Sequence, residues 1–356
     1  MVNSHYVPQF ILRHFCNDNK IMYCDKNAKT IEYRNVKSVF AEKGYYSDQT
    51  EKDLCYQIEY DFSVLYHNKL ENPVNSVVLN EAELFILKKY LIVSAIRYKY
   101  IFTESELEYR DGLGDSYKTD VDNNLKKVLQ TKNMNDLFKL ISMDNPMKSV
   151  EKLMTGERLD DDNINMPLWA DVKNIVYSYI VFIKAPEKEK LIISDRGRGI
   201  YEGSMSRRKL TTLMGYCMTH PDPAMMKILF MIDPHDYTIY PLTKDIAILS
   251  MSTFFKLFTD SDIKANVKLP DDCPTVSSML GFGTREDIAP PKVKIFRGKK
   301  EYRYKVNRLG TYDISFLNCL MMAQAQNHFA FSDLMDISKS IENISDYEEF
   351  EFLRKL

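Results

Sequence analysis

Two long segments near the start of the chain repeat apolar residues at three- and four-residue spacing, and this periodicity constrains the fold most strongly. In residues 50–71 the apolar stripe consists of Leu54, Ile58, Phe62, Leu65 and Tyr66. In residues 80–109 it consists of Leu84, Leu87, Leu91 and Ala95. The spacing predicts two long helices, followed by a third over about 121–142 and a shorter one near 147–154.

Shorter apolar runs elsewhere favour strands. Two β-rich runs within residues 20–40 flank the turn-prone sequence DKNAK and predict a hairpin. The sequence KLIIS at 190–194 predicts a strand that runs directly into Asp195. Residues 227–251 contain further β-like runs, broken at DPHD and PLTKD. The pattern therefore predicts an α+β fold that is predominantly helical and has a small mixed or antiparallel sheet.

The rest of the chain completes this expected architecture. Residues 285–304 are expected to form an exposed basic loop or ribbon, and residues 312–342 return to a helical pattern. We expect a single body over residues 1–356. A soft division fits the same pattern, with the N-terminal hairpin and helices in 1–155 and a sheet-containing half with the C-terminal helices in 164–356.

Composition excludes several classes of function. The formal net charge of −2 gives no long-range attraction to a polyanion, so any contact with nucleic acid must be local. Twelve glycines are few for 356 residues, and neither GxxxxGK[ST] nor a GxGxxG after a strand-like run occurs. P-loop and dinucleotide-binding chemistry are therefore not expected, and no cofactor is identified.

Hydropathy and cysteine spacing indicate the compartment. The most apolar run, YLIVSAI at 90–96, is too short to cross a membrane, so no membrane partner is expected. The start of the chain lacks the basic and apolar regions of a secretory signal, which predicts a cytoplasmic protein. The cysteines lie far apart without a CxxC pair, at positions 16, 24, 55, 217, 273 and 319. Reduced thiols are therefore expected, and a structural zinc site is not.

The opening sequence NSHYVPQFILRHF, residues 3–15, is unusually rich in histidine, proline, glutamine, arginine and aromatic residues for a chain terminus. A short helix is predicted over 6–16, and a spacing of four would place His5, Gln9 and Arg13 on one face. Histidine titrates near neutrality and arginine binds phosphate or carboxylate, so His5 and Arg13 are candidate catalytic residues and Gln9 a candidate substrate contact. The alternative is an anchoring helix whose polar side chains satisfy buried backbone groups.

Two acidic residues outside this segment are further catalytic candidates. Glu59 interrupts an apolar stripe, and Arg97 on the second long helix is its expected partner. The pair is either a salt bridge or part of a substrate site. Asp195 ends an apolar run, where polar side chains often line a functional crevice. Its alternative role is to cap the following turn.

Several candidates concern substrate binding. Arg196 and Arg198, in the sequence SDRGRG, form either an anion-binding rim or a solvated loop. Asn318 on the C-terminal helix is a weaker candidate. The stretch 292–305 mixes basic and aromatic side chains, which suits phosphate contact and base stacking but also an exposed hairpin edge. DPHD at 233–236 and the pair Asp271–Asp272 lack matched ligands, so no metal ligands are assigned and a divalent metal stays an open alternative.

Separated motifs in a fixed order resemble one family. They are HYVPQFILRHF at 5–15, AEKGYYS at 41–47, IE at 58–59, Arg97, LIISD at 191–195, YPLTKDIAILS at 240–250 and DISFLNCLMMAQAQNHFAFS at 313–332. This order resembles an uncharacterised bacterial family, domain of unknown function 4238, over nearly the whole chain. The family tends to have Asn-Pro after the Ser-Asp, where this chain has RGRG at 196–199. The resemblance implies no established reaction.

Two classes of function follow from these residues. The first is a hydrolase or transferase acting on a phosphate-containing substrate, most concretely a nuclease-like effector that uses His5 as acid/base and binds nucleic acid or a nucleotide. The second is a non-catalytic binding or regulatory protein, in which the polar motif residues are structural and the 292–305 stretch binds a partner. Convergence of His5, Arg13 and Asp195 in one cleft would favour the first class.

Overall fold

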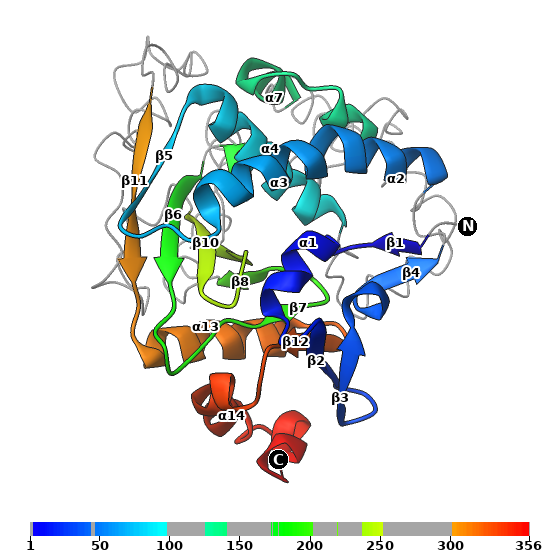
Figure 1. Cartoon of the computed structure of the whole chain (residues 1–356), viewed down its shortest axis with the longest axis vertical. Coiled ribbons are helices and arrows are strands. Elements are labelled where there is room, and N and C mark those ends of the chain that lie inside the picture. Colours follow the sequence, from blue (N-terminus) through cyan, green and yellow to red (C-terminus); the bar gives the residue numbers. More distant parts are fainter. Residues whose placement is uncertain are drawn as a thin grey trace.

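The computed structural model describes residues 3–43, 47–97, 125–140, 172, 174–176, 178–201, 219, 237–251 and 301–355. In the view of Figure 1, helices lie across the top and the largest sheet lies at the left. The N-terminal strand lies at the right, and the C-terminal helices lie at the bottom.

The first predicted long helix is confirmed, but it has a form that periodicity does not indicate. It consists of four consecutive segments, α2 (Asp48–Leu54), η3 (Cys55–Glu59), α3 (Tyr60–Leu65) and η4 (Tyr66–Leu70). The segments η3 and η4 are π-helical turns, in which the backbone N–H bonds to the carbonyl five residues earlier, as in Glu71 N–H to the Tyr66 carbonyl at 2.9 Å. Such turns are rare and are frequent at functional sites.

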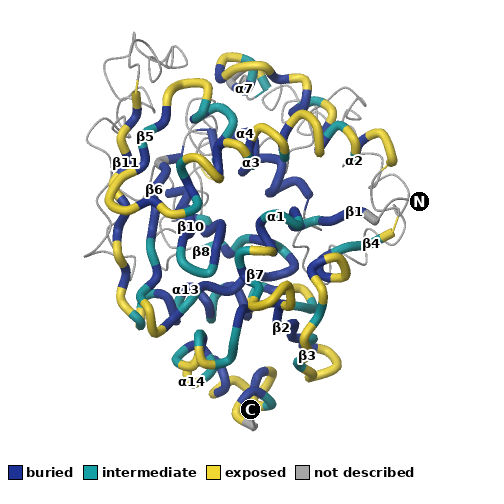
Figure 2. The backbone as a smooth tube through the Cα atoms, viewed as in Figure 1, coloured by how far each residue is buried: buried dark blue, intermediate teal, exposed yellow. Residues whose placement is uncertain are grey.

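The second long helix, α4 (Glu81–Arg97), confirms the prediction over the residues that the structure describes. Every residue of α4 from 87 to 97 is buried, and Figure 2 shows this helix behind the more exposed α2 and α3. A helix buried on all sides must satisfy its own charges. Lys88 donates to the carbonyls of Ile175, Val176 and Ser178 at 2.7–3.0 Å. Lys89 donates to those of Leu129 and Thr131 at 2.9 and 2.7 Å.

The helix predicted over 121–142 is described in part. Residues 125–129 are helical, and α7 (Met134–Leu140) follows after a short break. The Lys89 contacts therefore lie at the end of the first of these helical pieces, where backbone carbonyls have no partner within the helix. The predicted short helix at 147–154 lies outside the described residues.

The largest sheet is mixed and has six strands in the order β5-β11-β6-β10-β9-β8. These are β5 (Ser76–Leu79), β11 (Tyr302–Arg308), β6 (Tyr179–Lys184), β10 (Ile246–Met251), β9 (Tyr237–Pro241) and β8 (Gly199–Tyr201). The pair β11 and β6 is parallel, whereas the other neighbours are antiparallel. All six residues of β10 are buried, as expected for a strand inside a sheet that is covered on both faces.

A second sheet has four strands in the order β3-β2-β12-β7. It contains the predicted hairpin, β2 (Lys20–Asp25) with β3 (Thr30–Asn35), together with β12 (His328–Phe331) and β7 (Ile193–Ser194). The short 3-10 turn η2 (Val36–Ser38) leads to β4 (Ala41–Lys43), which pairs antiparallel with β1 (Asn3–His5) as a third, two-stranded sheet.

The predicted fold class is therefore wrong in its balance. The described residues contain sheets of two, six and four strands, not a predominantly helical body with one small sheet. The missed strands are β1, which falls just before the predicted N-terminal helix, and β4, β5, β8, β11 and β12, each seven residues or shorter. Runs this short do not distinguish a strand from a buried piece of helix by periodicity.

The C-terminal part differs from the continuous helical pattern predicted over 312–342. Helix α13 (Thr311–Gln324) is confirmed, but β12 follows it, and then come η7 (Met335–Ile337), α14 (Ser338–Ile344) and the 3-10 segment η8 (Glu348–Lys355). Helix α13 packs closely on β8, since a Cβ at Gly199 would lie 2.8 Å from Met321 Cγ. Among the described residues, no helix is both long enough and apolar enough to cross a bilayer.

The N-terminal segment lies between the helical part and the sheets. After β1, helix α1 (Gln9–Leu12) begins next to Pro8, and the 3-10 turn η1 (Arg13–Phe15) follows. The Phe10 ring lies 6.0–6.4 Å from those of Phe62, Tyr66 and Tyr90. The backbone before and after Phe10 contacts other parts of the fold. Tyr6 N–H donates to the Phe40 carbonyl, and Lys244 N–H donates to the His14 carbonyl. The segment therefore ties three parts of the fold together.

We expect the aromatic stack beneath this segment to be a major source of stability. The rings of Phe62 and Tyr90 are parallel with centroids 3.6 Å apart, and Phe62 is fully buried. Phe62→Ala should lower the free energy of unfolding by about 3–5 kcal/mol, because the surrounding rings cannot close the cavity. Tyr60→Ala, in the same helix at 66% exposure, should change it by less than about 0.5 kcal/mol. Urea unfolding measures both, and equal losses would contradict this account.

Candidate functional site

His5 lies in β1 and not in a helix, so the predicted helical stripe of His5, Gln9 and Arg13 is wrong at its first member. Its contact with Gln9 nevertheless exists, because Gln9 Nε2 lies 2.9 Å from His5 Nε2. The amide nitrogen of glutamine can only donate, so His5 Nε2 accepts and the ring proton is on Nδ1. The imidazole is almost fully buried. This arrangement leaves His5 neutral with a defined basic nitrogen.

An ion pair between a buried arginine and a partly exposed glutamate lies beside His5. Arg97, at the end of α4, is 1% exposed, and its Nη2 lies 2.6 Å from Oε1 of Glu59. Glu59 is the last residue of the π-turn η3. The predicted pairing of Glu59 with Arg97 is thus present in the structure. The π-turn adds a residue to the helix and so sets the direction in which Glu59 leaves it.

Glu51 from α2 is a third charged group of this cluster, and sequence reasoning missed it. Burial raises the pKa of Glu51 above its ordinary 4.5, while Arg97 acts in the opposite direction, as do hydrogen bonds with Ser4 and the His5 backbone. Burial also lowers the pKa of His5 below 6.5, which the Val39 backbone and Glu59 partly offset. His5, Gln9, Glu51, Glu59 and Arg97 are called the His5 cluster below. They come from five elements, namely β1, α1, α2, η3 and α4.

The second arginine predicted for this site lies elsewhere. Arg13 is exposed on η1, and the groups whose pKa values it lowers are His14 and Cys16. The charges that act on the pKa of His5 are those of Glu59 and Arg97. The structure therefore gives Arg97, and not Arg13, as the guanidinium next to His5.

Asp195 serves a turn in the C-terminal part. Its carboxylate accepts the backbone N–H groups of Gln326, Asn327 and His328 at 2.8–2.9 Å, where α13 ends and β12 begins. His328 Nδ1 lies 3.7 Å from the same carboxylate. Asp195 therefore caps a turn that is distant in sequence, and not the turn that directly follows it, which was the alternative stated for it. The charge of Asp195 helps to raise the pKa of Tyr6, the residue after His5, but it is not among the charges that act on the pKa of His5 itself.

The remaining binding candidates also have internal contacts. Asn318 is buried and donates to the Lys190 carbonyl at 2.7 Å and to Ser340 Oγ at 2.9 Å, while it accepts from Ile192 N–H. Arg196 and Arg198 are half-buried in the turn after Asp195, and burial lowers the pKa of Arg196. That turn closes through Gly197 N–H to the Ser194 carbonyl at 2.8 Å, with Gly197 at a φ of 56°. Of the 292–305 stretch, only residues 301–305 are described.

A pocket of about 410 Å³ lies on another side of the π-turn η3. Its polar lining includes Gln57, Asp61, Gln130 and Lys132, and Lys89 reaches it from α4. Burial lowers the pKa of Lys89 to about 8, an effect that Asp61 and Asp136 partly offset. Ile58 also lines this pocket and is the chain neighbour of Glu59. The pocket is therefore adjacent in sequence to the His5 cluster, but the cluster residues do not line it.

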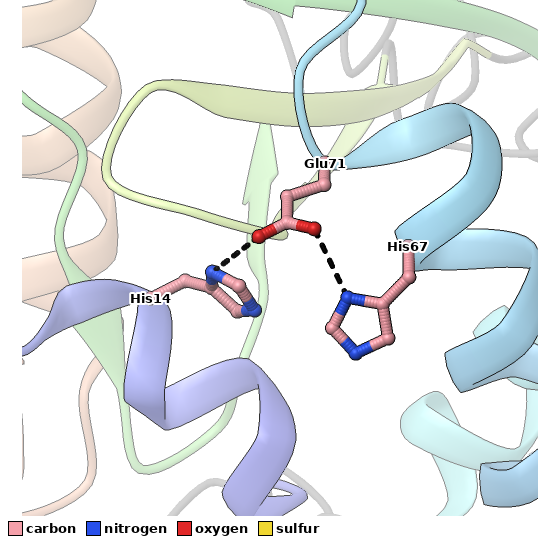
Figure 3. A group of neighbouring side chains, drawn as sticks. All are labelled: His14, His67 and Glu71. Atoms are coloured by element: carbon pink, nitrogen blue, oxygen red, sulfur yellow. Dashed lines mark hydrogen bonds and ion pairs between the residues drawn. The ribbon is translucent and has the colours of Figure 1, made fainter.

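Figure 3 shows a second group of ionisable side chains, His14, His67 and Glu71, here called the His14 cluster. The Glu71 carboxylate lies between the two imidazoles, 3.0 Å from His67 Nδ1 and 3.6 Å from His14 Nδ1. Burial lowers the pKa of His14, and Glu71 partly offsets this. Sequence reasoning missed all three residues, although the spacing of His67 and Glu71 on a predicted helix was a usable signal.

The structure thus defines an α+β protein with two histidine–glutamate clusters, both supplied in part by residues 3–15 and by a π-helical turn. The family model described as "Protein of unknown function (DUF4238)" matches residues 3–333, and the chain belongs to this family. No curated protein and no solved structure matches the chain.

Asp195→Asn tests the capping role directly. The substitution keeps the shape of the side chain but removes the charge that three N–H groups share, so it should lower the free energy of unfolding by about 1–3 kcal/mol. Asp53→Asn is the matched control, since Asp53 accepts a surface hydrogen bond from Gln49 Nε2. Thermal and urea unfolding of both variants give the comparison. An Asp195→Asn protein as stable as the control would count against a capping role.

The buried His5 and the half-buried His14 should make stability depend on pH. The folded-state pKa values of His5 and His14 lie below the unfolded value of 6.5. Their contribution is therefore complete above pH 6.5 and is lost as the pH falls through the folded values. Melting temperatures measured from about pH 8 to about pH 5 should fall less steeply for His5→Gln and His14→Gln than for the wild type. Identical slopes in all three proteins would contradict the assignment.

Proposed function

We propose that this protein is a cytoplasmic hydrolase or transferase that acts on a phosphate-containing substrate, most concretely a nuclease-like effector with His5 as its acid/base group. One observation carries the proposal. A neutral imidazole, oriented by Gln9, lies beside a buried arginine and two carboxyl groups of unequal environment. Groups of this kind with perturbed pKa values are typical of sites for proton transfer.

Each member of the His5 cluster has a role in this proposal. His5 Nε2 is the candidate general base for the attacking water or hydroxyl group, and because its single lone pair accepts the Gln9 amide in this structure, Gln9 must move aside for the proton transfer. Glu51, whose pKa burial raises, is the candidate proton donor to the leaving group. Arg97 supplies a permanent positive charge for the phosphoryl oxygens, and Glu59 orients that guanidinium through its 2.6 Å contact.

The proposed substrate class is a nucleic acid or nucleotide. Its support is the pairing of a phosphate-seeking guanidinium with an acid/base histidine, a combination suited to phosphodiester cleavage by a water or ribose hydroxyl. The chain's small net charge means that such a substrate would be held by local contacts. Arg196 and Arg198 remain proposed contacts for an anion in this scheme.

The second candidate function is a non-catalytic binding or regulatory protein. The internal contacts of Asp195 and Asn318 favour it, because two of the predicted site residues are engaged in holding α13, β12 and the 190–192 backbone together. In this alternative the polar motif residues stabilise the fold and the 292–305 basic stretch meets the partner.

His5→Gln distinguishes the two functions. Glutamine preserves hydrogen bonding but cannot exchange a proton at neutral pH, so the rate of hydrolysis should fall by about a hundredfold or more. Purified wild type and variant are incubated with RNA, single- and double-stranded DNA and dinucleotides, and products are separated by chromatography. The wild-type rate should rise with pH through the lowered pKa of His5, because the neutral form acts as the base.

His328→Gln is the matched control, since it removes one imidazole from a different part of the fold. It should keep the wild-type rate, and circular dichroism verifies that both variants are folded. A folded His5→Gln protein with the wild-type rate of hydrolysis would contradict the catalytic proposal. So would a wild type that cleaves none of these substrates, and either result would favour the binding function.

A further inference from the structure

We propose that His14, His67 and Glu71 bind one divalent transition-metal ion of the zinc class. Among the described residues, these three form the group of histidine, cysteine, aspartate or glutamate side chains whose ligand atoms lie close enough to share an ion. All three atoms lie within 4.8 Å of one another. The site is separate from the His5 cluster and takes no part in the function proposed above.

The distances suit an ion after a small movement of side chains. Ligand atoms around a tetrahedral zinc ion are about 3.3 Å apart, as bond lengths of about 2.0–2.1 Å require. Glu71 Oε2 and His67 Nδ1 are 3.0 Å apart, and Glu71 Oε1 and His14 Nδ1 are 3.6 Å apart. The two imidazoles already point their Nδ1 atoms at one carboxylate, as Figure 3 shows. His67 is 54% exposed, so its ring has room to turn toward an ion.

The donor set selects the class of metal. Two imidazole nitrogens and one carboxylate are ligands that zinc, cobalt and nickel accept, whereas magnesium and calcium prefer oxygen ligands throughout. Three protein ligands also leave a fourth position of a tetrahedral ion for water or another small ligand, as in sites of the two-histidine, one-glutamate type. The proposal therefore concerns an ion with an open position and not a fully enclosed structural ion.

The scaffold holds the ligands from two directions. His67 lies within the π-turn η4, and Glu71 is its C-terminal cap. The buried Tyr66 packs between them and the N-terminal segment, with its ring 4.9 Å from that of His14 and 5.4 Å from that of His67. The Tyr66 hydroxyl makes a long hydrogen bond to the Leu242 carbonyl at 3.5 Å. A metal ion here would link η1 to the end of the long helix.

Direct metal binding tests the proposal without any assay of activity. The full chain, with any purification tag removed, is stripped with a chelator and titrated with zinc chloride by calorimetry. We expect one zinc ion per chain. Cobalt chloride should then give visible absorption bands of a four- or five-coordinate ion, without the near-ultraviolet band that a cysteine thiolate ligand produces. That band matters because Cys16 and Cys55 are free thiols.

Three variants decide the outcome. His67→Ala and Glu71→Gln should each weaken zinc binding by about tenfold or more, since each removes a ligand. His328→Ala should bind zinc like the wild type, because its two nitrogens face different carboxylates, those of Asp25 and Asp195. A wild type that binds no zinc, a His67→Ala protein that binds it equally well, or a cobalt–thiolate band would overturn the proposal. None of these results depends on whether His5 is catalytic.

Discussion

Burial of helix α4 on all sides from Leu87 to Arg97 is the constraint on which the rest of the structure depends. From Leu87 to Arg97 this helix has no exposed side, yet it carries three cationic side chains. Each must find a partner, because an unpaired buried charge is far more costly than a lost surface contact. Lys88 and Lys89 find backbone carbonyls in segments 40 and more residues away, and Arg97 finds the carboxylate of Glu59. The charges thus determine which segments surround the helix. The His5 cluster forms around the last of these charges, Arg97.

The N-terminal segment places its side chains in different surroundings in turn. His5 faces the Arg97–Glu59 pair, and Phe10 lies on the aromatic stack. Between them, the charges of Glu42 and Asp195 help to raise the pKa of Tyr6. His14 then reaches the end of the long helix. A strand followed by a single turn of helix achieves this, since neighbouring residues of a strand point to opposite faces. A terminus that meets so many parts of the fold accounts for the unusual residue content of the opening motif.

The sequence predicted the long helices, the hairpin and the Glu59–Arg97 pair because each depends on local periodicity or on a charge in an apolar stripe. It did not predict β12 or β5, whose strands are four residues long and gain their pairing partners from distant segments. Nor did it predict Glu51, because nothing in a polar first turn of a helix shows that the side chain is partly buried. Arg13 was grouped with His5 by a spacing of four on a predicted helix, and Asp195 by its place at the end of an apolar run, but their positions are set by tertiary contacts that no local pattern records.

The two π-turns make the long helix sensitive to its length as well as to its residues. Each turn takes up one residue more than an α-helical turn would, so the segments on its two sides keep their faces. Removing one residue from the α-helical segment α3 (Tyr60–Leu65) instead would rotate everything beyond it by about 100° relative to the rest. Substitutions along the exposed side would be absorbed far more readily. The number of residues in the long helix is therefore under stricter constraint than the identity of most side chains on its surface.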